Sequence, residues 1–311
     1  MKVLLLGAAG FIGTNLAIKL SADLNNIITL VDRDMTFFNT INSIGLKNTS
    51  VKISGFNVDT DFDSLLQGQD IVFHLVSTTV PTTSNQQISE ELIANVVTTS
   101  KMLDACVRVG VKKVVFISSG GTVYGKEVNC PLRENTSTNP ISSYGIQKVT
   151  IEKLLYLYRY LYGLDYRVIR LANPYGPYQR PNGILGAVTT FTYKALKNEE
   201  ISVFGDGTII RDFIYIDDAV RGIINIVEGT NKHRTYNLGC GYGTSINELL
   251  VSIQNALHCT LKVSYHEGRK VDVPVNYLDI SRYENAYGKL NPLSLEDGIK
   301  QTAKFMQKNI L

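Results

Sequence analysis

The sequence predicts an α/β fold with a doubly wound parallel sheet and a second, smaller domain. Along the first half of the chain, short apolar runs rich in Val and Ile alternate with longer helical patterns. The short runs lack polar alternation, which is typical of strands buried on both faces of a parallel sheet. Their repeated strand–helix–strand order predicts right-handed crossovers between neighbouring parallel strands.

The expected elements follow one another regularly up to Leu171. Strands are expected at Val3–Leu6, Ile27–Val31, Val51–Ser54, Ile71–Val76, Val114–Ser118 and Tyr166–Leu171, and helices at Phe11–Ser21, Ser89–Val109 and Ser143–Tyr162. A turn-rich segment, Asn173–Gly183, then changes the pattern. We therefore predict a dinucleotide-binding domain of residues 1–172 plus 211–240, and a smaller substrate-binding domain of residues 173–210 plus 241–311.

Composition indicates a globular protein and narrows its partners. The 311 residues are 44% hydrophobic and 19% charged, and the net charge of +3 is too mild to indicate a nucleic-acid partner. No apolar run outside the N-terminal strand approaches the roughly 20 residues of a membrane span, so no membrane partner is expected. The four cysteines show neither C-x-x-C spacing nor a compact framework, so we expect a reducing compartment, the cytoplasm, and no bound metal.

A glycine-rich turn joins the first expected strand to the first expected helix. The segment GAAGFIG places Gly7, Gly10 and Gly13 there. Such a turn needs a positive φ and a close approach of the backbone to a diphosphate, and the N-terminus of the following helix faces the anion. This pattern in this position predicts a dinucleotide site.

The second expected strand ends in an acidic residue that indicates which dinucleotide is bound. Asp32 lies nineteen residues after Gly13, where a carboxylate accepts hydrogen bonds from the adenosine ribose. An acid in this position repels the extra phosphate of NADP, so Asp32 favours NAD. The neighbouring Arg33 leaves NADP open as the alternative.

A tyrosine and a lysine stand four residues apart in the segment SSYGIQK. Tyr144 and Lys148 therefore share one helix face, one turn apart. The ammonium favours the phenolate by Coulomb attraction and is expected to lower the pKa of the tyrosine from about 10 toward neutrality. The pair predicts a general base, with chance pairing on a solvated helix as the alternative.

Together these segments resemble the extended short-chain dehydrogenase/reductase group, and within it the NAD-dependent epimerase/dehydratase family with its UDP-glucose (galactose) 4-epimerases. The resemblance covers nearly the whole chain, through GAAGFIG, Asp32, HLVSTTV (His74–Val80), Asn95, SSGGTVYG (Ser118–Gly125), YGIQK, NPYGP, ISVFGDG, IRDFIYIDD, YNLGCG and RKVDVP. It implies a Rossmann-type fold, an NAD-dependent isomerase and a UDP-sugar substrate.

The resemblance also implies a mechanism. Tyr144 takes the proton of the sugar 4-hydroxyl while the C4 hydride passes to NAD, and Lys148 holds the nicotinamide ribose and keeps the tyrosine anionic. The resulting 4-keto sugar turns over and receives the hydride on its other face. NAD is thereby regenerated within one turnover.

The family pattern implies further site residues on both domains. For NAD these are Gly7, Gly10, Phe11, Ile12, Gly13, Asp32, Asn57, Val58, Leu75, Val76, Ser77, Asn95, Ser118, Tyr144, Lys148 and Ala172. For the substrate they are Asn173 at the diphosphate or sugar, Leu185, Val203 and Phe204 around the base, Arg211 and Arg269 at the phosphates, Asp272 at a ribose hydroxyl, and Asn276 beside the C2 substituent.

One departure from the family pattern lies in SSGGTVYG. Relatives usually carry Ser or Thr at its third position, bonded to the same sugar oxygen as the tyrosine, but this chain has Gly120. Thr122 is our first choice for the missing hydroxyl, Ser119 the second, and a water molecule the third. Gly121-Thr122 also stands where 4,6-dehydratases have an Asp-Glu pair, which disfavours dehydration.

The sequence leaves two alternative functions open and also predicts the range of sugars and the oligomeric state. Arg180 would suit a uronate 4-epimerase if it clamps a carboxylate at C6, and a non-catalytic NAD-binding regulator is possible on the same fold. Asn276 is smaller than tyrosine, so N-acetylated sugars are expected to be accepted as well. Apolar residues on more than one stripe of the helices Ser89–Val109 and Ser143–Tyr162 predict a homodimer.

Overall fold

The chain divides into two compact units. The computed structural model describes residues 1–81, 83–126, 129–181, 186–268 and 273–311. The first unit comprises Met1–Val123, Pro140–Ile169 and Asn231–Thr235, and the second comprises Tyr124–Asn139, Arg170–Thr230 and Tyr236–Leu311. These limits differ from the sequence-based boundaries at residues 124–139, 170–172, 211–230 and 236–240, all of which fall in the second unit. The sequence-based division follows the binding role expected of each domain, and it stays a prediction.

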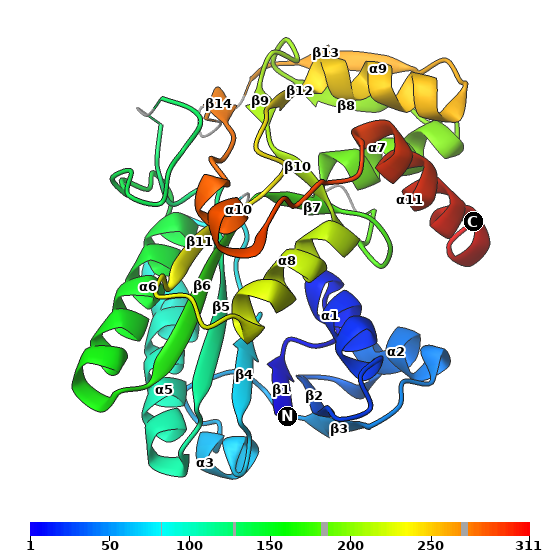
Figure 1. Ribbon diagram of the computed structural model, residues 1–311. Helices are drawn as coiled ribbons and strands as arrows, with labels where there is room; N and C mark the ends of the chain where they lie inside the picture. Colours follow the sequence, from blue (N-terminus) through cyan, green and yellow to red (C-terminus); the bar gives the residue numbers. More distant parts are fainter. Residues whose placement is uncertain (82, 127–128, 182–185, 269–272) are drawn as a thin grey trace. The chain divides into compact units, whose positions relative to one another are not determined.

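A seven-stranded sheet in the order β11-β6-β5-β4-β1-β2-β3 confirms the doubly wound α/β fold (Figure 1). Its strands are β1 (Lys2–Leu6), β2 (Ile27–Asp32), β3 (Thr49–Ile53), β4 (Ile71–His74), β5 (Lys113–Ser119), β6 (Asp165–Leu171) and β11 (Thr235–Leu238). The pairs linking β5, β4, β1, β2 and β3 are parallel. The strands β1, β4, β5 and β6 are buried almost throughout, as their apolar runs predict.

The strand order reverses between β1 and β4, which makes this position the topological switch point. Leu6 at the end of β1 pairs with Val31 of β2 and with His74 of β4. The carboxyl ends of the three strands therefore meet at one edge of the sheet. In open α/β sheets, ligands bind in the crevice at such an edge.

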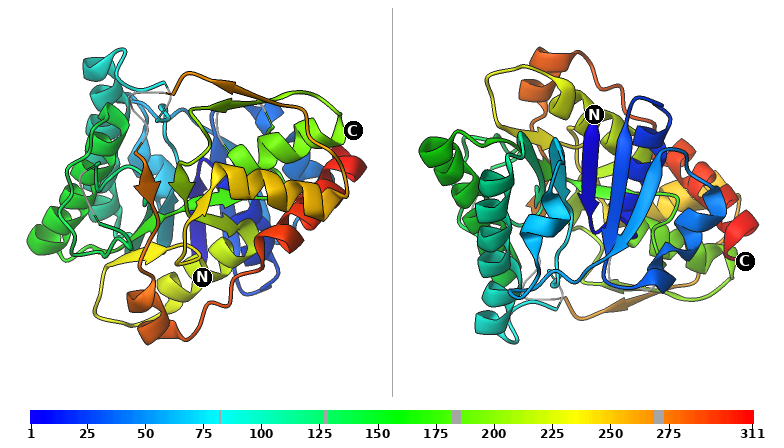
Figure 2. Two further views of the ribbon diagram at one scale, coloured as in Figure 1. Left: turned by 90° about the horizontal axis from the view of Figure 1, so that it is seen from above. Right: turned by 90° about the horizontal axis from the view of Figure 1, so that it is seen from below.

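Helices cover both faces of this sheet. They are α1 (Phe11–Ser21), α2 (Asn39–Ile44), α3 (Phe62–Leu66), α4 (Ile88–Leu92), α5 (Thr98–Val109) and α6 (Ser143–Tyr162). The helices α5 and α6 lie side by side against one face, and α1 lies on the other (Figures 1 and 2). The core between α5, α6 and the sheet includes Leu4, Val72, Leu103, Phe116 and Leu155.

The long helix expected at Ser89–Val109 is interrupted. A π-helical turn, Ile93–Val97, joins α4 to α5. The side chain of Asn95 donates to the Glu91 carbonyl (3.1 Å), and the Thr98 hydroxyl donates to the Ile93 carbonyl (3.0 Å). These side-chain bonds compete with the regular backbone ladder, which is a recognised cause of local irregularity in helices.

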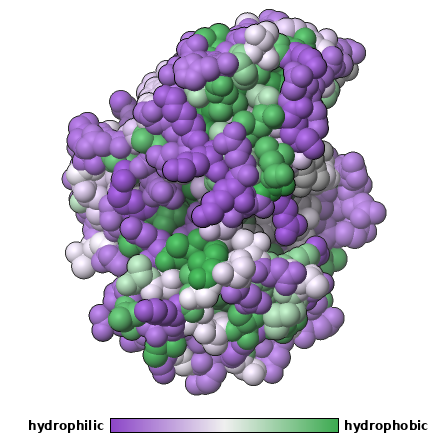
Figure 3. Space-filling model, turned by 90° about the vertical axis from the view of Figure 1, so that its right-hand side faces the viewer, coloured by the Kyte–Doolittle hydropathy of each residue, from purple (hydrophilic) through white to green (hydrophobic). Residues whose placement is uncertain are grey.

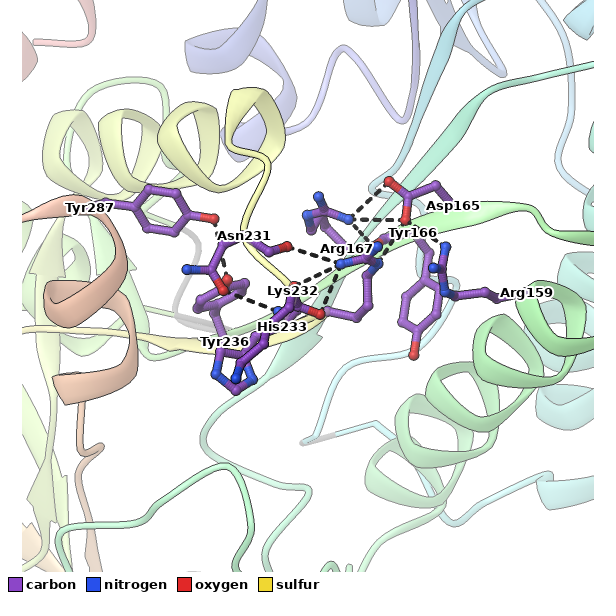
Figure 4. A network of polar contacts seen from close by, with 10 residues as sticks. Arg159, Asp165, Tyr166, Arg167, Asn231, Lys232, His233, Tyr236 and Tyr287 are labelled. Atoms are coloured by element: carbon purple, nitrogen blue, oxygen red, sulfur yellow. Dashed lines mark hydrogen bonds and ion pairs between the residues drawn. The ribbon is translucent and has the colours of Figure 1, made fainter.

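An ion-pair cluster fixes the amino end of β6 to the far end of α6. Asp165 pairs with Arg159 of α6 (3.1 Å), with Arg167 (3.0 Å) and with Arg234 (2.7 Å), as Figure 4 shows for the first two. Arg167 is buried, and its guanidinium also donates to the Tyr166 carbonyl (2.8 Å). The cluster lies at the opposite end of β6 from the edge where ligands are expected.

The second unit contains short strands and helices. Its strands are β7 (Asn173–Tyr175), β8 (Ile201–Phe204), β9 (Ile210–Arg211), β10 (Phe213–Tyr215), β12 (Thr244–Ser245), β13 (Val263–His266) and β14 (Val275–Asn276). Its helices are α7 (Ala187–Leu196), α8 (Ile216–Glu228), α9 (Ile246–Leu257), α10 (Ser281–Tyr287) and α11 (Leu295–Asn309). The strands pair as β10-β7, β12-β9-β14 and β13-β8. A small core of Ile201, Val203 and Leu250 lies between β8 and α9.

Polar side chains dominate much of the surface. On the face in Figure 3, apolar side chains lie in small groups among hydrophilic ones. Within the ranges that the structure describes, no helix combines the length and the apolar character needed to cross a membrane.

Candidate active site

The glycine-rich turn after β1 has the geometry of a diphosphate cradle. Gly7 has φ +85°, a conformation that favours glycine, and a β-carbon there would lie 3.2 Å from Val76, just after β4. A β-carbon on Gly13 would lie 2.4 Å from the Gly7 carbonyl oxygen, so the helix packs against the turn only with glycine there. Gly10 begins α1 without a side-chain cap, which leaves the first N–H groups of the helix, including those of Phe11 and Ile12, directed at the turn. These residues fit the diphosphate of NAD.

Asp32 lies beside this turn at the end of β2. One carboxylate oxygen accepts the Ala9 N–H (3.1 Å) and the other accepts the Arg33 N–H (2.9 Å). A carboxylate has about four acceptor positions, so capacity remains for ribose hydroxyls. The Arg33 guanidinium lies over the Phe37 ring, 5.3 Å from its centroid. This stacking supplies Arg33 with a partner other than a cofactor phosphate.

The other predicted cofactor residues of the first unit lie mainly at the same edge of the sheet. Leu75, Val76 and Ser77 directly follow β4, and Asn95 is buried with its amide bonded to Thr78. Asn57 and Val58 lie in the turn between β3 and α3. Ser118 is buried in β5, where its hydroxyl donates to Glu152 of α6 (2.6 Å). Ala172 belongs to the second unit.

Tyr144 and Lys148 lie in the first two turns of α6, as predicted. The Lys148 ammonium lies 5.4 Å from the centroid of the Tyr144 ring and 4.6 Å from that of Phe116. It donates a hydrogen bond to the Ile117 carbonyl of β5 (3.0 Å). Both side chains therefore lie at the carboxyl half of β5.

The expected direction of the tyrosine pKa is wrong. Burial raises the pKa of Tyr144 to about 12 and lowers the pKa of Lys148 to about 8. The cause is desolvation, which disfavours the charged form of each group. The ammonium is bonded to a backbone carbonyl, and its attraction for the phenolate does not offset the cost of burying that anion.

Thr122 lies against the first turn of α6. A β-carbon on Gly145, the residue after Tyr144, would lie 2.8 Å from the Thr122 carbonyl oxygen, so glycine permits this close contact. The Thr122 hydroxyl oxygen is buried and has no hydrogen-bond partner within the described part of the chain. A buried hydroxyl without a partner costs roughly 1–3 kcal/mol, and such groups mark candidate ligand contacts. Ser119, the second choice, is half-buried at the end of β5.

In the second unit, Arg211 and Asn276 lie on the paired strands β9 and β14, and Asn173 bonds Asp212, the residue after Arg211. Asn173 begins β7 and bonds the Asp212 carbonyl through its backbone N–H (3.0 Å) and its side-chain amide (2.9 Å). Asn276 of β14 pairs with Arg211 of β9 and is buried. The Arg211 guanidinium donates to the carbonyls of Ile210 (2.9 Å) and Val273 (2.6 Å).

The two predicted base-pocket residues of β8 point in opposite directions. Val203 packs in the small core, whereas Phe204 is 41% exposed and lies 5.7 Å, centroid to centroid, from the His266 ring. Only Phe204 thus presents its side chain at the surface. The remaining substrate predictions, Leu185, Arg269 and Asp272, lie outside the described residues.

Sequence reasoning missed several buried polar residues near Tyr144. Glu91, Ser143, Gln147 and Glu152 are all less than one-tenth exposed, and each is hydrogen-bonded. One sequence signal was available, because Ser143 and Gln147 are four residues apart and so share a helix face. Their partner Glu91 is about fifty positions away, and no local pattern indicates it.

Comparisons with known proteins agree with this geometry. Residues 3–239 match the model of the NAD dependent epimerase/dehydratase family. The UDP-glucose 4-epimerase of Mycolicibacterium smegmatis is 33% identical over 309 residues, which is 99% of each chain. The crystal structure of UDP-glucose 4-epimerase from Thermotoga maritima with UDP-glucose has a TM-score of 0.91 and 31% identity over 100% of both chains. That of UDP-glucuronic acid 4-epimerase from Bacillus cereus with UDP-glucuronic acid and NAD has a TM-score of 0.89 and 26% identity over 99% of both. The chain therefore belongs to the NAD dependent epimerase/dehydratase family.

Proposed function

We propose that this protein is an NAD-dependent isomerase that epimerises C4 of a UDP-sugar, UDP-glucose or UDP-galactose, through a transient 4-keto intermediate. The observation that carries this proposal is the Tyr144–Lys148 pair of α6, in which Tyr144 is half-buried and Lys148 is buried, close to Thr122 in a unit that also holds the diphosphate cradle. Relatives that align over nearly the whole chain are UDP-glucose 4-epimerases, which supports the same reaction.

The residues of the chain divide the chemistry between them. When bound, NAD supplies reversible hydride transfer at C4 and a positively charged ring that favours an anionic neighbour. Tyr144 accepts the proton of the sugar 4-hydroxyl and returns it when the keto group is reduced. Lys148 holds a positive charge one helical turn from the phenol, and Thr122 supplies the hydroxyl that is absent at Gly120. Each role stays a proposal.

The intact catalytic pair favours an enzyme over a non-catalytic NAD-binding regulator. A regulator has no requirement for a Tyr and a Lys one turn apart in a desolvated position, since desolvation shifts the pKa of each group against its charged form. UDP-glucuronate is the second candidate substrate. The likeness to the Bacillus cereus enzyme supports it. It ranks below UDP-glucose because Arg180, the residue expected to clamp the carboxylate of a uronate, is exposed.

A panel of substrates tests the function. Purified protein is incubated without added cofactor with UDP-glucose, UDP-galactose, UDP-GlcNAc and UDP-glucuronate, and the products are identified by NMR. We expect interconversion of UDP-glucose and UDP-galactose, with NAD co-purifying with the protein. An NAD-loaded protein that converts none of the four sugars would support the regulator instead.

We also propose that Asn276 admits the N-acetylated sugars. Its side chain is buried on β14 next to Arg211, and its amide can bond an acetamido group, so no buried polar group is left unpaired. Asn276→Tyr should suppress turnover of UDP-GlcNAc and spare UDP-glucose, whereas Asn276→Ser should keep both. Equal effects on the two sugars would mean that another residue selects the C2 substituent, for example Tyr277, whose ring lies against Gly243.

The proposal also covers the assembly of the enzyme and its location in the cell. We propose a homodimer joined through α4, α5 and α6, because α6 carries two apolar stripes: Leu155 and Tyr158 are buried, while Leu157 and Leu161 are 43% and 53% exposed. A cytoplasmic location, expected from the spacing of the cysteines, is part of the same proposal.

A further inference from the structure

A buried polar cluster joins α4 to the first two turns of α6. Glu91, Ser143 and Gln147 are 7%, 3% and 2% exposed. The Ser143 hydroxyl donates to one Glu91 carboxylate oxygen (2.5 Å), and the Gln147 amide donates to the same oxygen (3.1 Å) and to the Ser143 hydroxyl (2.9 Å). One oxygen of Glu91 thus accepts hydrogen bonds from two residues of α6.

The same cluster holds the segment that follows β4. The side-chain amide oxygen of Gln147 accepts from the Thr79 hydroxyl (3.3 Å), and the backbone carbonyl of Thr79 accepts from the Ser77 hydroxyl (2.8 Å). Asn95, one turn after Glu91, bonds the N–H (3.0 Å) and the hydroxyl (2.7 Å) of Thr78. The helical segment that carries Glu91 and Asn95 therefore contacts both α6 and the segment that follows β4.

The cluster restrains the rotation of α6. Ser143 and Gln147 each directly precede one member of the Tyr144–Lys148 pair. On a helix, residues at i and i+4 define one face, so bonds that fix Ser143 and Gln147 also fix the direction in which the following residues point. The helix begins at this point, where the Ser142 hydroxyl accepts the Gly145 N–H (3.2 Å) and the Ser143 N–H is bonded to Asn85 (2.7 Å).

We infer that Glu91 is a positioning residue for Tyr144 and Lys148: through Ser143 and Gln147 it sets the direction of the catalytic face of α6 relative to the segment Ser77–Thr79. This inference rests on the proposed function. Glu91 acts through α6 and has no assigned contact with substrate or cofactor. A small misplacement of a catalytic group mainly slows the chemical step, so the loss of Glu91 should affect kcat more than KM.

Three variants separate positioning from simple stability. Glu91→Leu removes the acceptor and leaves two buried donors unpaired, whereas Glu91→Gln keeps a carbonyl oxygen that can accept from both. Tyr158→Phe is the matched control, because it removes a hydrogen bond of α6 to Asp104 (2.6 Å) at a distance of about 20 Å along the helix from Tyr144. Gln147→Met replaces Glu91→Leu if that variant does not fold.

The measurements are steady-state kinetics and an NMR signal of the tyrosine itself. Glu91→Leu should lower kcat by about 10- to 100-fold with KM changed less than about twofold, Glu91→Gln should restore most of kcat, and Tyr158→Phe should leave it near the wild-type value. In protein labelled at the ring carbon that bears the hydroxyl, the Tyr144 resonance, assigned by its loss in Tyr144→Phe, should move in Glu91→Leu and not in Tyr158→Phe.

Two results would overturn the inference: an unmoved Tyr144 resonance in Glu91→Leu, or equal effects of Glu91→Leu and Tyr158→Phe. A wild-type protein that epimerises no UDP-sugar would refute the proposed function instead. In that case the Tyr144 resonance still decides whether Glu91 positions the tyrosine, because it is recorded without turnover.

Discussion

Tyr144 is the residue on which the proposed chemistry depends most directly. Burial raises its pKa to about 12, so the phenol is favoured over the phenolate, and the proposed role as a base requires a nearby positive charge that opposes this shift. Tyr144→Phe should lower kcat by at least about a thousandfold, since general-base contributions run to roughly 10²–10⁴. The measurement is epimer formation followed by NMR, with NAD content as the control. Near-normal turnover in this variant would refute the role of Tyr144.

Thr122 gives a residue-scale prediction in which activity and stability change in different directions. Its buried hydroxyl has no partner in the described residues, so Thr122→Val should leave the free energy of unfolding unchanged or raise it slightly. If that hydroxyl bonds the sugar oxygen during reaction, kcat should fall more than KM rises. Ser119→Ala is the control. A slow Ser119 variant beside a normal Thr122 variant would reverse the assignment.

Residue types could be predicted at this site, but their electrostatics could not. The spacing of Tyr144 and Lys148 predicts that they share one helix face, and both residues lie in α6 of the structure. The pKa of each group depends on how deeply the fold buries it, and the contact of Lys148 with the Ile117 carbonyl comes from β5, about thirty residues away. Desolvation is a tertiary property that local sequence does not contain.

At the scale of elements, boundaries were predicted best where the ends of an element carry their own signals. The helix α6 has the expected limits, because the Ser142 hydroxyl caps its first turn and Gly163 ends it with φ +73°. The π-helical turn at Ile93–Val97 was not predicted. It depends on the side chain of Asn95, which is oriented by Thr78 from a different segment.

Asp212 links several elements of the second unit and gives a prediction on pH. Its buried carboxylate accepts the N–H groups of Cys240 (2.7 Å), Leu278 (3.3 Å) and Gly241 (3.4 Å), and burial raises its pKa from 3.8 to about 6. The folded protein thus binds this proton more tightly than the unfolded chain does. The contribution of Asp212 to stability is therefore largest at low pH and declines as the pH rises from about 4 through 6.

Asp212→Asn removes this titration and is the test. From pH 4 to pH 7 the free energy of unfolding of the wild type, relative to the variant, should fall by up to about 3 kcal/mol, at about 1.4 kcal/mol for each unit of pKa difference. The measurement is urea unfolding of both proteins at several pH values. Parallel stability curves for the two proteins would contradict the raised pKa.

At the scale of the whole molecule, the exposed stripe of α6 predicts self-association. Ile93 and Val97 of the π-helical turn, which packs beside α6, are also 50% and 43% exposed. A helix that only covers a sheet needs one apolar stripe, and burying each large aliphatic side chain contributes roughly 1.5–3 kcal/mol. A symmetric partner that presents the same helices would bury both copies of the stripe in one interface.

Light scattering at micromolar concentration measures the outcome. The wild type should have twice the 34.5 kDa mass of the chain. The double variant Leu157→Asp, Leu161→Asp should have the mass of one chain, because its interface would bury two carboxylates per subunit without partners. Val251→Asp is the matched control: Val251 is 54% exposed on α9, as much as Leu161, but it lies in the second unit, so this variant should stay dimeric. A wild-type mass near that of a single chain would refute the dimer, and loss of the dimer in Val251→Asp would place the interface on α9 instead of α6.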